Sequence, residues 1–377
     1  MESTARRLVE TDAGISRFGE SRFGPSRFGP ARGGTWLDDG RRDAKGQLTG
    51  WYRPATGDGP PTELTVLRPT AGSATLPAPG LRVEKPAGPT ALNLPGGRHG
   101  VLLFHGLSST PLELQYLARG LHRAGYSVRI AVIEGYSHGL PSRAPSGHRE
   151  WAAAALAEFD RMRAQCDTLA VGGLCIGALL SLAVAARRGE AVSHILALST
   201  TLHYDGWAAP RSRVFLPLAR VFPLLGRIAV REREPFGLKD ERLRAWVAAQ
   251  MKESGGSDAG AAVLRVSDLL QAQDLMRLVR QGLAAITAPT LLLHAREDEA
   301  ASPRSAFEVA SGVSSKRVHC VILNDSYHMI SIDKEKARVL GEMKEFLQAS
   351  GSTADAGSKM ATTVKHPAPR STEHARA

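Results

Sequence analysis

Cysteine is scarce in this chain, with three among 377 residues. Cys166, Cys175 and Cys320 lie far apart, so they match neither the close spacings of a zinc site nor a disulfide framework. In a reducing compartment such side chains remain thiols. The fold is therefore expected to depend on its hydrophobic core, and Cys166 and Cys320 are interpreted as packing residues.

Long hydrophobic runs are also missing. No uncharged apolar stretch reaches the length of about 18 residues that a membrane-spanning helix needs. The first residues, MESTARRLVETDAG, include basic side chains but not the apolar segment of a secretory signal. We therefore expect a cytoplasmic protein without a spanning helix.

The charge is unbalanced toward basic residues, and the formal net charge is +11. Such an excess can attract nucleic acid or anionic lipid. The arginines are scattered among acidic residues, however, and the sequence has neither an RNP signature nor a dense basic run interleaved with aromatics. We expect no specific nucleic-acid partner, and at most weak peripheral contact with a membrane surface.

Composition sets off both ends of the chain. Residues 1–35 contain SRFG three times, in a context rich in Gly, Arg and Pro that cannot bury enough apolar surface to fold. They are predicted to be disordered, and a basic tether for RNA or membrane is an alternative role for the repeats. Residues 36–87 are predicted to be a Gly/Pro-rich extension with one or two edge strands. Residues 351–377 are predicted to be a disordered polar tail.

Between these ends, apolar strands alternate with helices over residues 88–201 and 289–350. The strands are expected at 100–106, 126–133, 168–175, 192–200, 289–295 and 317–324, and the helices at 110–125, 148–165, 176–189 and 333–350. Such strands are typical of a mostly parallel sheet with helices on both faces, an α/β fold. Thr110 and Glu113 match a capping box at the first helix, and Asp333 matches the N-cap of the last.

Residues 202–288 interrupt this alternation and are too long for a plain loop. Three stretches have helical patterns, at 211–227, 238–254 and 267–286. We expect a helical cap over the carboxyl edge of the sheet. Its first helix should be kinked near Pro217 and Pro223 and should pack an apolar stripe on the domain below. Alternatively, part of this stripe lines an apolar ligand pocket, with Phe222 and Leu225 as lining residues.

The stretch GGLCIG, residues 172–177, carries the clearest chemical signal. G-x-C-x-G between an apolar strand and an apolar helix is typical of a nucleophile elbow, which exposes its central residue at the top of a sheet. Gly173 and Gly177 are needed because larger side chains would collide with the tight turn. The following helix presents partial positive charge at its N-terminus, which favours a thiolate at Cys175. Cys175 is therefore the candidate nucleophile.

Backbone donors for a developing negative oxygen are expected beside this cysteine. His105 and Gly106 follow the first strand of the alternating region, and the next residue, Leu107, can offer its backbone N–H. The second donor is the N–H of Ile176, directly after the nucleophile. His105 and Gly106 are assigned to substrate binding.

The acid and the base are expected after the last two strands. HAREDEAASP supplies the acid, and Asp298 is its best-placed member, with Glu297 and Glu299 as neighbours. NDSYHMISID supplies His328 as the base. Asp205, which follows an earlier strand, is a second candidate for the acid. The order nucleophile, acid, base is that of α/β hydrolases.

From about residue 90 to 348 the chain resembles the α/β-hydrolase superfamily, in particular the bacterial carboxylesterase and monoacylglycerol-lipase group. The matching stretches are VLLFHGLSSTPLEL, VIEGYSHG, VGGLCIGALLSL, PTLLLHAREDEAASP and SYHMISIDKEK. The resemblance implies an acid at Asp298, a base at His328 and oxyanion donors at Leu107 and Ile176. It implies the α/β-hydrolase fold with a helical cap insertion, in which Phe222 and Leu225 would line an acyl pocket.

The chain departs from this group at the elbow, where Cys175 replaces serine. Dienelactone hydrolases and polyhydroxyalkanoate synthases are similar folds that use cysteine there. We therefore expect a hydrolase of small acyl esters or thioesters with a Cys-His-Asp triad and an acyl-thioester intermediate. Acyl transfer to another acceptor and a non-catalytic binding role are the alternatives. No metal or organic cofactor is implied.

Overall fold

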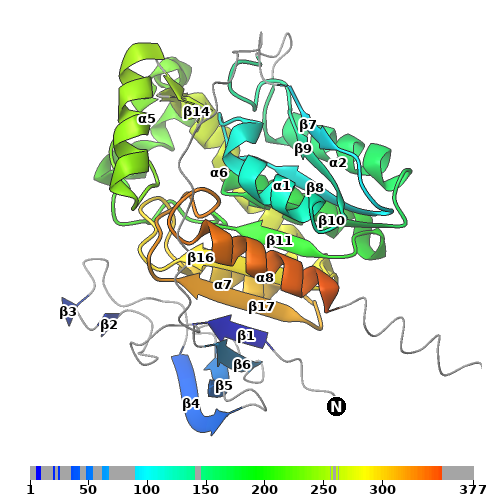
Figure 1. Ribbon diagram of the computed structural model, residues 1–377. Coiled ribbons are helices and arrows are strands. Elements are labelled where there is room, and N and C mark those ends of the chain that lie inside the picture. The colour runs from blue at the N-terminus through cyan, green and yellow to red at the C-terminus, as the bar shows by residue number, and fades with distance from the viewer. Residues whose placement is uncertain are drawn as a thin grey trace, which may run out of the picture.

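The computed structural model describes residues 90–140, 146–254, 256–257, 260–261 and 263–349, together with short strand segments before residue 90. Its centre is an 11-stranded sheet with the order β4-β5-β6-β1-β17-β16-β11-β10-β8-β9-β7 (Figure 1). The strands after residue 90 in this sheet are β7 (Leu92–Leu94), β8 (His99–Phe104), β9 (Ser127–Ala131), β10 (Thr168–Leu174), β11 (Ile195–Leu198), β16 (Thr290–Ala295) and β17 (Val318–Leu323). All of these pairings are parallel except that of β7 with β9.

Helices cover both faces of this sheet (Figure 1). One face carries α1 (Gln115–His122) and α8 (Lys336–Gln348), and the other carries α2 (His148–Arg163), α3 (Ile176–Arg188), α6 (Val266–Gly282) and α7 (Arg304–Gly312). Along β8, Leu102 packs on the face that carries α2, α3, α6 and α7, and Leu103 packs on the face that carries α1 and α8. Successive side chains of a strand point to opposite faces, so a strand buried on both sides must be apolar throughout. The expected mostly parallel α/β sheet is confirmed.

The N-terminal strands extend the sheet beyond β17. Strand β1 (Arg6–Val9) pairs in parallel with β17, and β6 (Thr62–Leu67), β5 (Leu48–Arg53) and β4 (Thr35–Arg42) follow it. A short hairpin, β2 (Glu20–Ser21) with β3 (Gly24–Pro25), lies within the SRFG repeats.

The predicted disorder of residues 1–35 is therefore wrong for these strands. Without β1, strand β17 would be an edge with unpaired backbone groups, and an extended segment of almost any composition can pair there. The other residues of 1–35, and the predicted tail at 351–377, lie outside the described residues.

The insertion at 202–288 contains short, irregular pieces followed by two helices. The pieces are η3 (Arg211–Phe215), α4 (Leu218–Val221), η4 (Pro223–Arg227) and the strands β12 (Ala229–Arg231), β13 (Gly256–Ser257), β14 (Gly260–Ala261) and β15 (Val263–Arg265). The helices are α5 (Glu241–Ser254) and α6, which occupy two of the three expected helical stretches. Figure 1 shows α5 beyond one end of the sheet, apart from the helices on its faces. Helix α7 and strands β12 to β15 are not among the expected elements.

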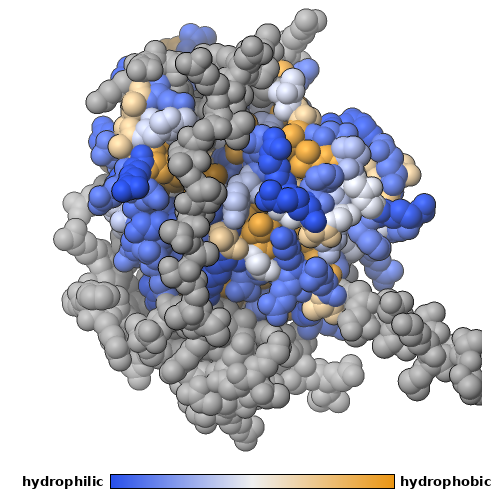
Figure 2. Space-filling model, in the orientation of Figure 1, coloured by the Kyte–Doolittle hydropathy of each residue, from blue (hydrophilic) through white to orange (hydrophobic). Residues whose placement is uncertain are grey.

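The single kinked helix expected at 211–227 is a wrong prediction. Pro217 and Pro223 have no backbone N–H to donate, and the chain breaks at both into η3, α4 and η4. The expected burial of its apolar stripe is also wrong for most members, because Val214, Phe215, Leu218, Val221, Phe222 and Leu224 are 47–73% exposed. Figure 2 shows apolar side chains among hydrophilic ones where α5 lies. Within the described ranges, no helix is both long and apolar enough to cross a bilayer.

Candidate active site

The elbow is a tight turn between β10 and α3. Cys175 has φ 59° and ψ −118°, a backbone conformation that side chains rarely adopt and that is common at functional sites. Its amide is held by the Leu198 carbonyl at 3.0 Å. A Cβ on Gly177 would lie 2.1 Å from the Phe104 carbonyl oxygen, and one on Gly173 would lie 2.5 Å from the same atom. The two glycines therefore let the turn pass directly against β8.

The loop after β17 places His328 beside Asp298. The His328 Nδ1 lies 2.7 Å from Oδ2 and 2.9 Å from Oδ1 of Asp298. The Asp298 carboxylate also accepts hydrogen bonds from the backbone N–H groups of Ala300 and Ala301, at 2.9 and 2.8 Å. His294 Nε2 lies 3.3 Å from the same carboxylate. Asp298 is thus fixed from several sides and aimed at His328.

Burial and charge oppose one another in this pair. Burial lowers the pKa of His328, but the charges of Asp298 and of a Cys175 thiolate outweigh it and hold that pKa well above its ordinary value. Burial raises the pKa of Asp298, but the charge and hydrogen bonds of His328 keep it below its ordinary value. Because Nδ1 is occupied by Asp298, the buried Nε2 is the ring nitrogen left for Cys175, and a side-chain hydrogen bond with Cys175 also contributes to the raised pKa of His328.

A loop from β8 closes over the other side of Cys175. A Cβ on Gly106 would lie 3.7 Å from the Cys175 Cβ. The Glu113 carboxylate accepts hydrogen bonds from the Gly106 N–H and the Ser109 hydroxyl, so it ties both ends of the loop together. Leu107 lies between these anchored residues. The structure thus brings Leu107 close to the elbow. Ile176 lies at the elbow because it directly follows Cys175 in the chain.

Glu113 does not complete the predicted capping box. Thr110 accepts a hydrogen bond from the Leu112 N–H at 3.3 Å, as an N-cap does. The carboxylate of Glu113 instead turns to Gly106 and Ser109, because their donors lie buried beside it. Burial raises the pKa of Glu113 to about 7.

His105 supports the loop after β8 through hydrogen bonds of its ring. It is 1% exposed, and its ring nitrogens lie 2.7 Å from the Gly106 carbonyl oxygen and 2.8 Å from the Ser137 hydroxyl. Burial lowers the pKa of His105 to about 4, so the ring is neutral at pH 7. A residue so enclosed cannot reach a substrate, which corrects its assignment to direct substrate binding. Gly106 keeps its place at the site.

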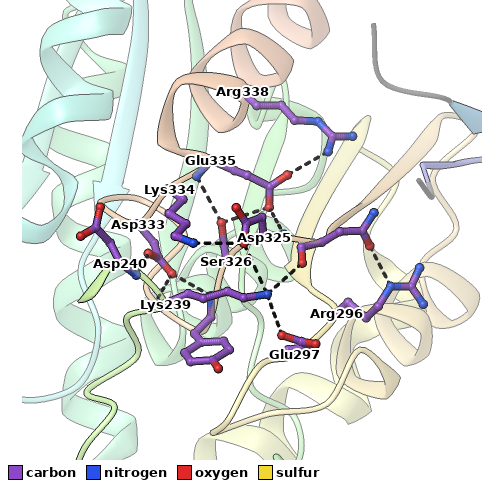
Figure 3. Close-up of polar contacts among 12 residues, drawn as sticks. Lys239, Asp240, Arg296, Glu297, Asp325, Ser326, Asp333, Lys334, Glu335 and Arg338 are labelled. Atoms are coloured by element: carbon purple, nitrogen blue, oxygen red, sulfur yellow. Dashed lines mark hydrogen bonds and ion pairs between the residues drawn. The ribbon is translucent and has the colours of Figure 1, made fainter. Parts of the chain in front are cut away.

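Figure 3 shows how the loop of His328 is anchored. The buried Asp333 carboxylate accepts hydrogen bonds from the backbone N–H groups of Tyr327, Lys239 and Asp240, at 2.8, 2.9 and 2.9 Å. The Lys239 ammonium also pairs with Glu297 at 2.7 Å. Asp333 is therefore not the N-cap of the last helix, which begins at Lys336. It joins the His328 loop to the insertion instead.

The other candidate acids lie elsewhere. The Asp205 carboxylate accepts hydrogen bonds from the N–H and hydroxyl of Ser302, at 2.8 and 2.9 Å. Glu297 is exposed and pairs with Lys239. Glu299 accepts a hydrogen bond from the backbone N–H of His328 at 3.1 Å, and burial raises the pKa of Glu299 to about 7. Among these carboxylates, Asp298 is the one bonded to the His328 ring.

The three thiols differ in exposure. Cys166 and Cys320 are buried, whereas Cys175 is partly exposed. Burial raises the pKa of Cys320 to about 12 and raises that of Cys166 as well. A thiol that resists ionisation is a poor nucleophile. This fits the interpretation of both as packing residues.

The predicted acyl-pocket residues are set apart from this centre. Phe222 is 58% exposed, and Leu225 packs with Ala219, Val266 and Leu270. This small cluster is separate from the two larger ones against which Cys175 packs. Across the described part of the chain, no group of three or more His, Cys, Asp or Glu side chains is arranged to hold a metal ion.

The sequence pattern does not predict the two hydroxyl groups after β11, those of Ser199 and Thr201. The Ser199 hydroxyl donates to the His328 carbonyl oxygen at 2.7 Å, and the Thr201 hydroxyl lies 3.4 Å from the Cys175 Sγ. Serine and threonine after a strand give no pattern of their own. Only the neighbouring position of β10 and β11 in the sheet brings them to the elbow.

Residues 97–335 match a family model described as serine aminopeptidase, S33. The chain belongs to this family. As a member, it is 23% identical to a thermostable monoacylglycerol lipase of Bacillus sp. (strain H-257) over 250 residues, which cover 66% of the chain and 90% of that lipase. It is 24% identical to a carboxylesterase of Bacillus subtilis (strain 168) over 263 residues, or 69% and 96% of the two chains.

Among solved structures, this family member resembles one described with LipS and LipT, two metagenome-derived lipolytic enzymes. The TM-score is 0.58 and the identity 23%, with 70% of this chain and 98% of that one covered. The α/β-hydrolase fold expected from the sequence is thereby confirmed. The role of Cys175 as a nucleophile stays a prediction, since the family is named for serine.

Proposed function

We propose that this protein hydrolyses carboxylic esters of small acyl substrates through Cys175, His328 and Asp298. One observation carries the proposal: His328 uses Nδ1 for Asp298, and its buried Nε2 is left for Cys175, which is the partly exposed thiol among the described cysteines. A nucleophile, a base and an orienting acid in this relation are the parts of a covalent acyl-transfer site. The lipase and esterase names of the relatives support esters as the substrate class.

In the proposed reaction, the Cys175 proton passes to Nε2 of His328 and the thiolate attacks the carbonyl carbon. A C–S bond forms, and the carbonyl π electrons move to the oxygen, which the N–H groups of Leu107 and Ile176 stabilise. The oxygen then restores the double bond, the ester C–O bond breaks, and His328 protonates the leaving alcohol. Water, deprotonated by His328, then attacks the acyl carbon. The C–S bond breaks with its electron pair on sulfur, the acid is released, and the proton on His328 returns to Cys175. Asp298 stabilises the imidazolium in both halves.

The test is to trap the thioester. A nitrophenyl ester is mixed with the protein, the reaction is stopped in acid, and intact mass followed by peptide mapping locates the acyl group. We expect one acyl group on Cys175 and release of free acid over time. Acylation elsewhere, or none during turnover, would contradict the mechanism. Acyl transfer predominating over hydrolysis when an alcohol is added would instead favour the transferase alternative.

We further propose that residues 88–201 and 289–350 form the catalytic core and 202–288 a cap that meets the acyl chain. The exposed side chains of η3, α4 and η4 support this, because apolar groups left in water are available to an apolar ligand or to a lipid surface. Each buried methylene contributes about 0.8 kcal/mol.

For this reason kcat/KM should rise with acyl length to a limit and then fall. Phe222→Ala and Leu225→Ala should move that limit, whereas Trp246→Ala, an exposed apolar position on α5, serves as the matched control. The measurement is kcat/KM for nitrophenyl esters of increasing chain length. If kcat/KM does not vary with acyl length, in the parent or in either variant, the cap does not bind the acyl chain.

A further inference from the structure

Thr201 places a side-chain hydroxyl beside the sulfur of Cys175. It is fully buried, and its hydroxyl oxygen is 3.4 Å from Cys175 Sγ and 3.2 Å from the Ser199 carbonyl oxygen. A hydroxyl has one hydrogen to donate and can also accept. It can therefore serve either neighbour, according to which of them needs a donor.

The two acceptors differ in what they need at each stage of the reaction. A neutral Cys175 thiol is a weak acceptor, so at that stage the Ser199 carbonyl oxygen is the better acceptor for the Thr201 hydrogen. A thiolate has no hydrogen and is a charged acceptor, and hydrogen bonds to charged groups are the stronger ones. Ionisation of Cys175 thus favours rotation of the Thr201 O–H from the Ser199 carbonyl to Sγ.

The surroundings hold Thr201 in place for this exchange. Ser199 has φ 40°, its N–H is bonded to the Leu293 carbonyl at 2.8 Å, and its hydroxyl is bonded to the His328 carbonyl. The Cys175 N–H is bonded to the Leu198 carbonyl at the end of the same strand. The short turn after β11 therefore contacts both Cys175 and the loop that carries His328. These contacts hold the Thr201 hydroxyl near Sγ.

We propose that Thr201 is a catalytic residue that stabilises the Cys175 thiolate by donating its hydroxyl hydrogen bond to Sγ. This rests on the proposed function, in which Cys175 is the nucleophile. The proton released by Cys175 goes to His328, and Thr201 gives up no proton; it only changes its acceptor. When the thiolate electron pair becomes the C–S bond of the thioester, Sγ is again a weak acceptor and the Thr201 O–H returns to Ser199.

The experiment measures alkylation of the full chain by iodoacetamide across pH 5–9, with Cys175 labelling read by peptide mass. Thr201→Val keeps the shape but removes the hydroxyl, and Thr201→Ser keeps the hydroxyl. Thr200→Val is the matched control, because it removes a neighbouring buried hydroxyl that has no partner among the described residues. Melting temperatures establish that each variant is folded, and Thr201→Ala replaces the valine variant if that one does not fold.

We expect the rate–pH profile of Thr201→Val to move about one unit toward higher pH. On its rising limb, alkylation should be about tenfold slower than in the parent, while Thr201→Ser and Thr200→Val should follow the parent profile. A folded valine or alanine variant whose profile overlays that of the parent would overturn the proposal. Alkylation by iodoacetamide does not depend on ester hydrolysis. Failure of the thioester trap would therefore count against the proposed function, while the alkylation profiles of the parent and the Thr201 variants would still test the role of Thr201.

Discussion

Cys175→Ala should abolish ester hydrolysis, with kcat falling by a factor of about 10⁴ or more, as losses of a covalent nucleophile do. The alanine has no atom that can form the acyl intermediate. Stability should change by only about 1 kcal/mol, because the thiol is partly exposed and the alanine adopts the same backbone turn. Initial rates on a nitrophenyl ester, with a thermal melt of the same sample, measure both effects.

The matched control is Cys166→Ala, which removes a buried thiol far from the elbow and should leave kcat near that of the parent. Cys175→Ser should retain weak hydrolysis, because the geometry suits serine, and it should resist iodoacetamide. Undiminished hydrolysis by the alanine variant would exclude Cys175 as the nucleophile. Equal sensitivity of the parent and the serine variant to iodoacetamide would place the reactive thiol at another cysteine.

Glu113→Gln should change how stability depends on pH. Burial raises the folded-state pKa of Glu113 to about 7, against about 4.5 for the same group in water. The folded protein therefore binds more protons than the unfolded chain between these values, so the parent loses stability as pH rises from about 4.5 to about 7. The total is about 3 kcal/mol. Glutamine carries no charge and can still accept from Gly106 and donate to Ser109, so it avoids this loss.

Urea unfolding of the parent and of Glu113→Gln at several pH values gives the difference in the free energy of unfolding. We expect this difference to move in favour of glutamine by about 3 kcal/mol from pH 4.5 to pH 8. Glu190→Gln, at an exposed carboxylate, is the matched control, and its difference should be small. A difference for Glu113→Gln that stays constant with pH would mean that burial does not raise the pKa of this carboxylate.

The parts of the site that the sequence predicts are those with a local pattern. Gly173 and Gly177 flank the elbow because their backbones touch β8, and the order of Cys175, Asp298 and His328 follows from strands that end at one edge. These requirements repeat in every chain of this fold, so they leave a recognisable spacing.

The remaining parts depend on contacts between distant segments. Glu113 is spaced correctly for a capping box, and only the folded loop offers it Gly106 and Ser109 instead. Thr201 and Ser199 reach the site because β10 and β11 are neighbours. Pro217 and Pro223 were expected to bend a helix, but with little beneath that segment to pack against, nothing offsets their missing hydrogen bonds and the helix breaks.

The Asp333 carboxylate joins the insertion at 202–288 to the loop that carries His328. It holds Lys239 and Asp240 of the insertion and Tyr327, the residue before His328. Hydrogen bonds to a charged group contribute about 1.5 to 3 kcal/mol each. Lifting the insertion at this point would strain the backbone that aims His328 at Cys175. A displacement confined to residues beyond Asp240, where α5 begins, would leave these three hydrogen bonds and the position of His328 intact.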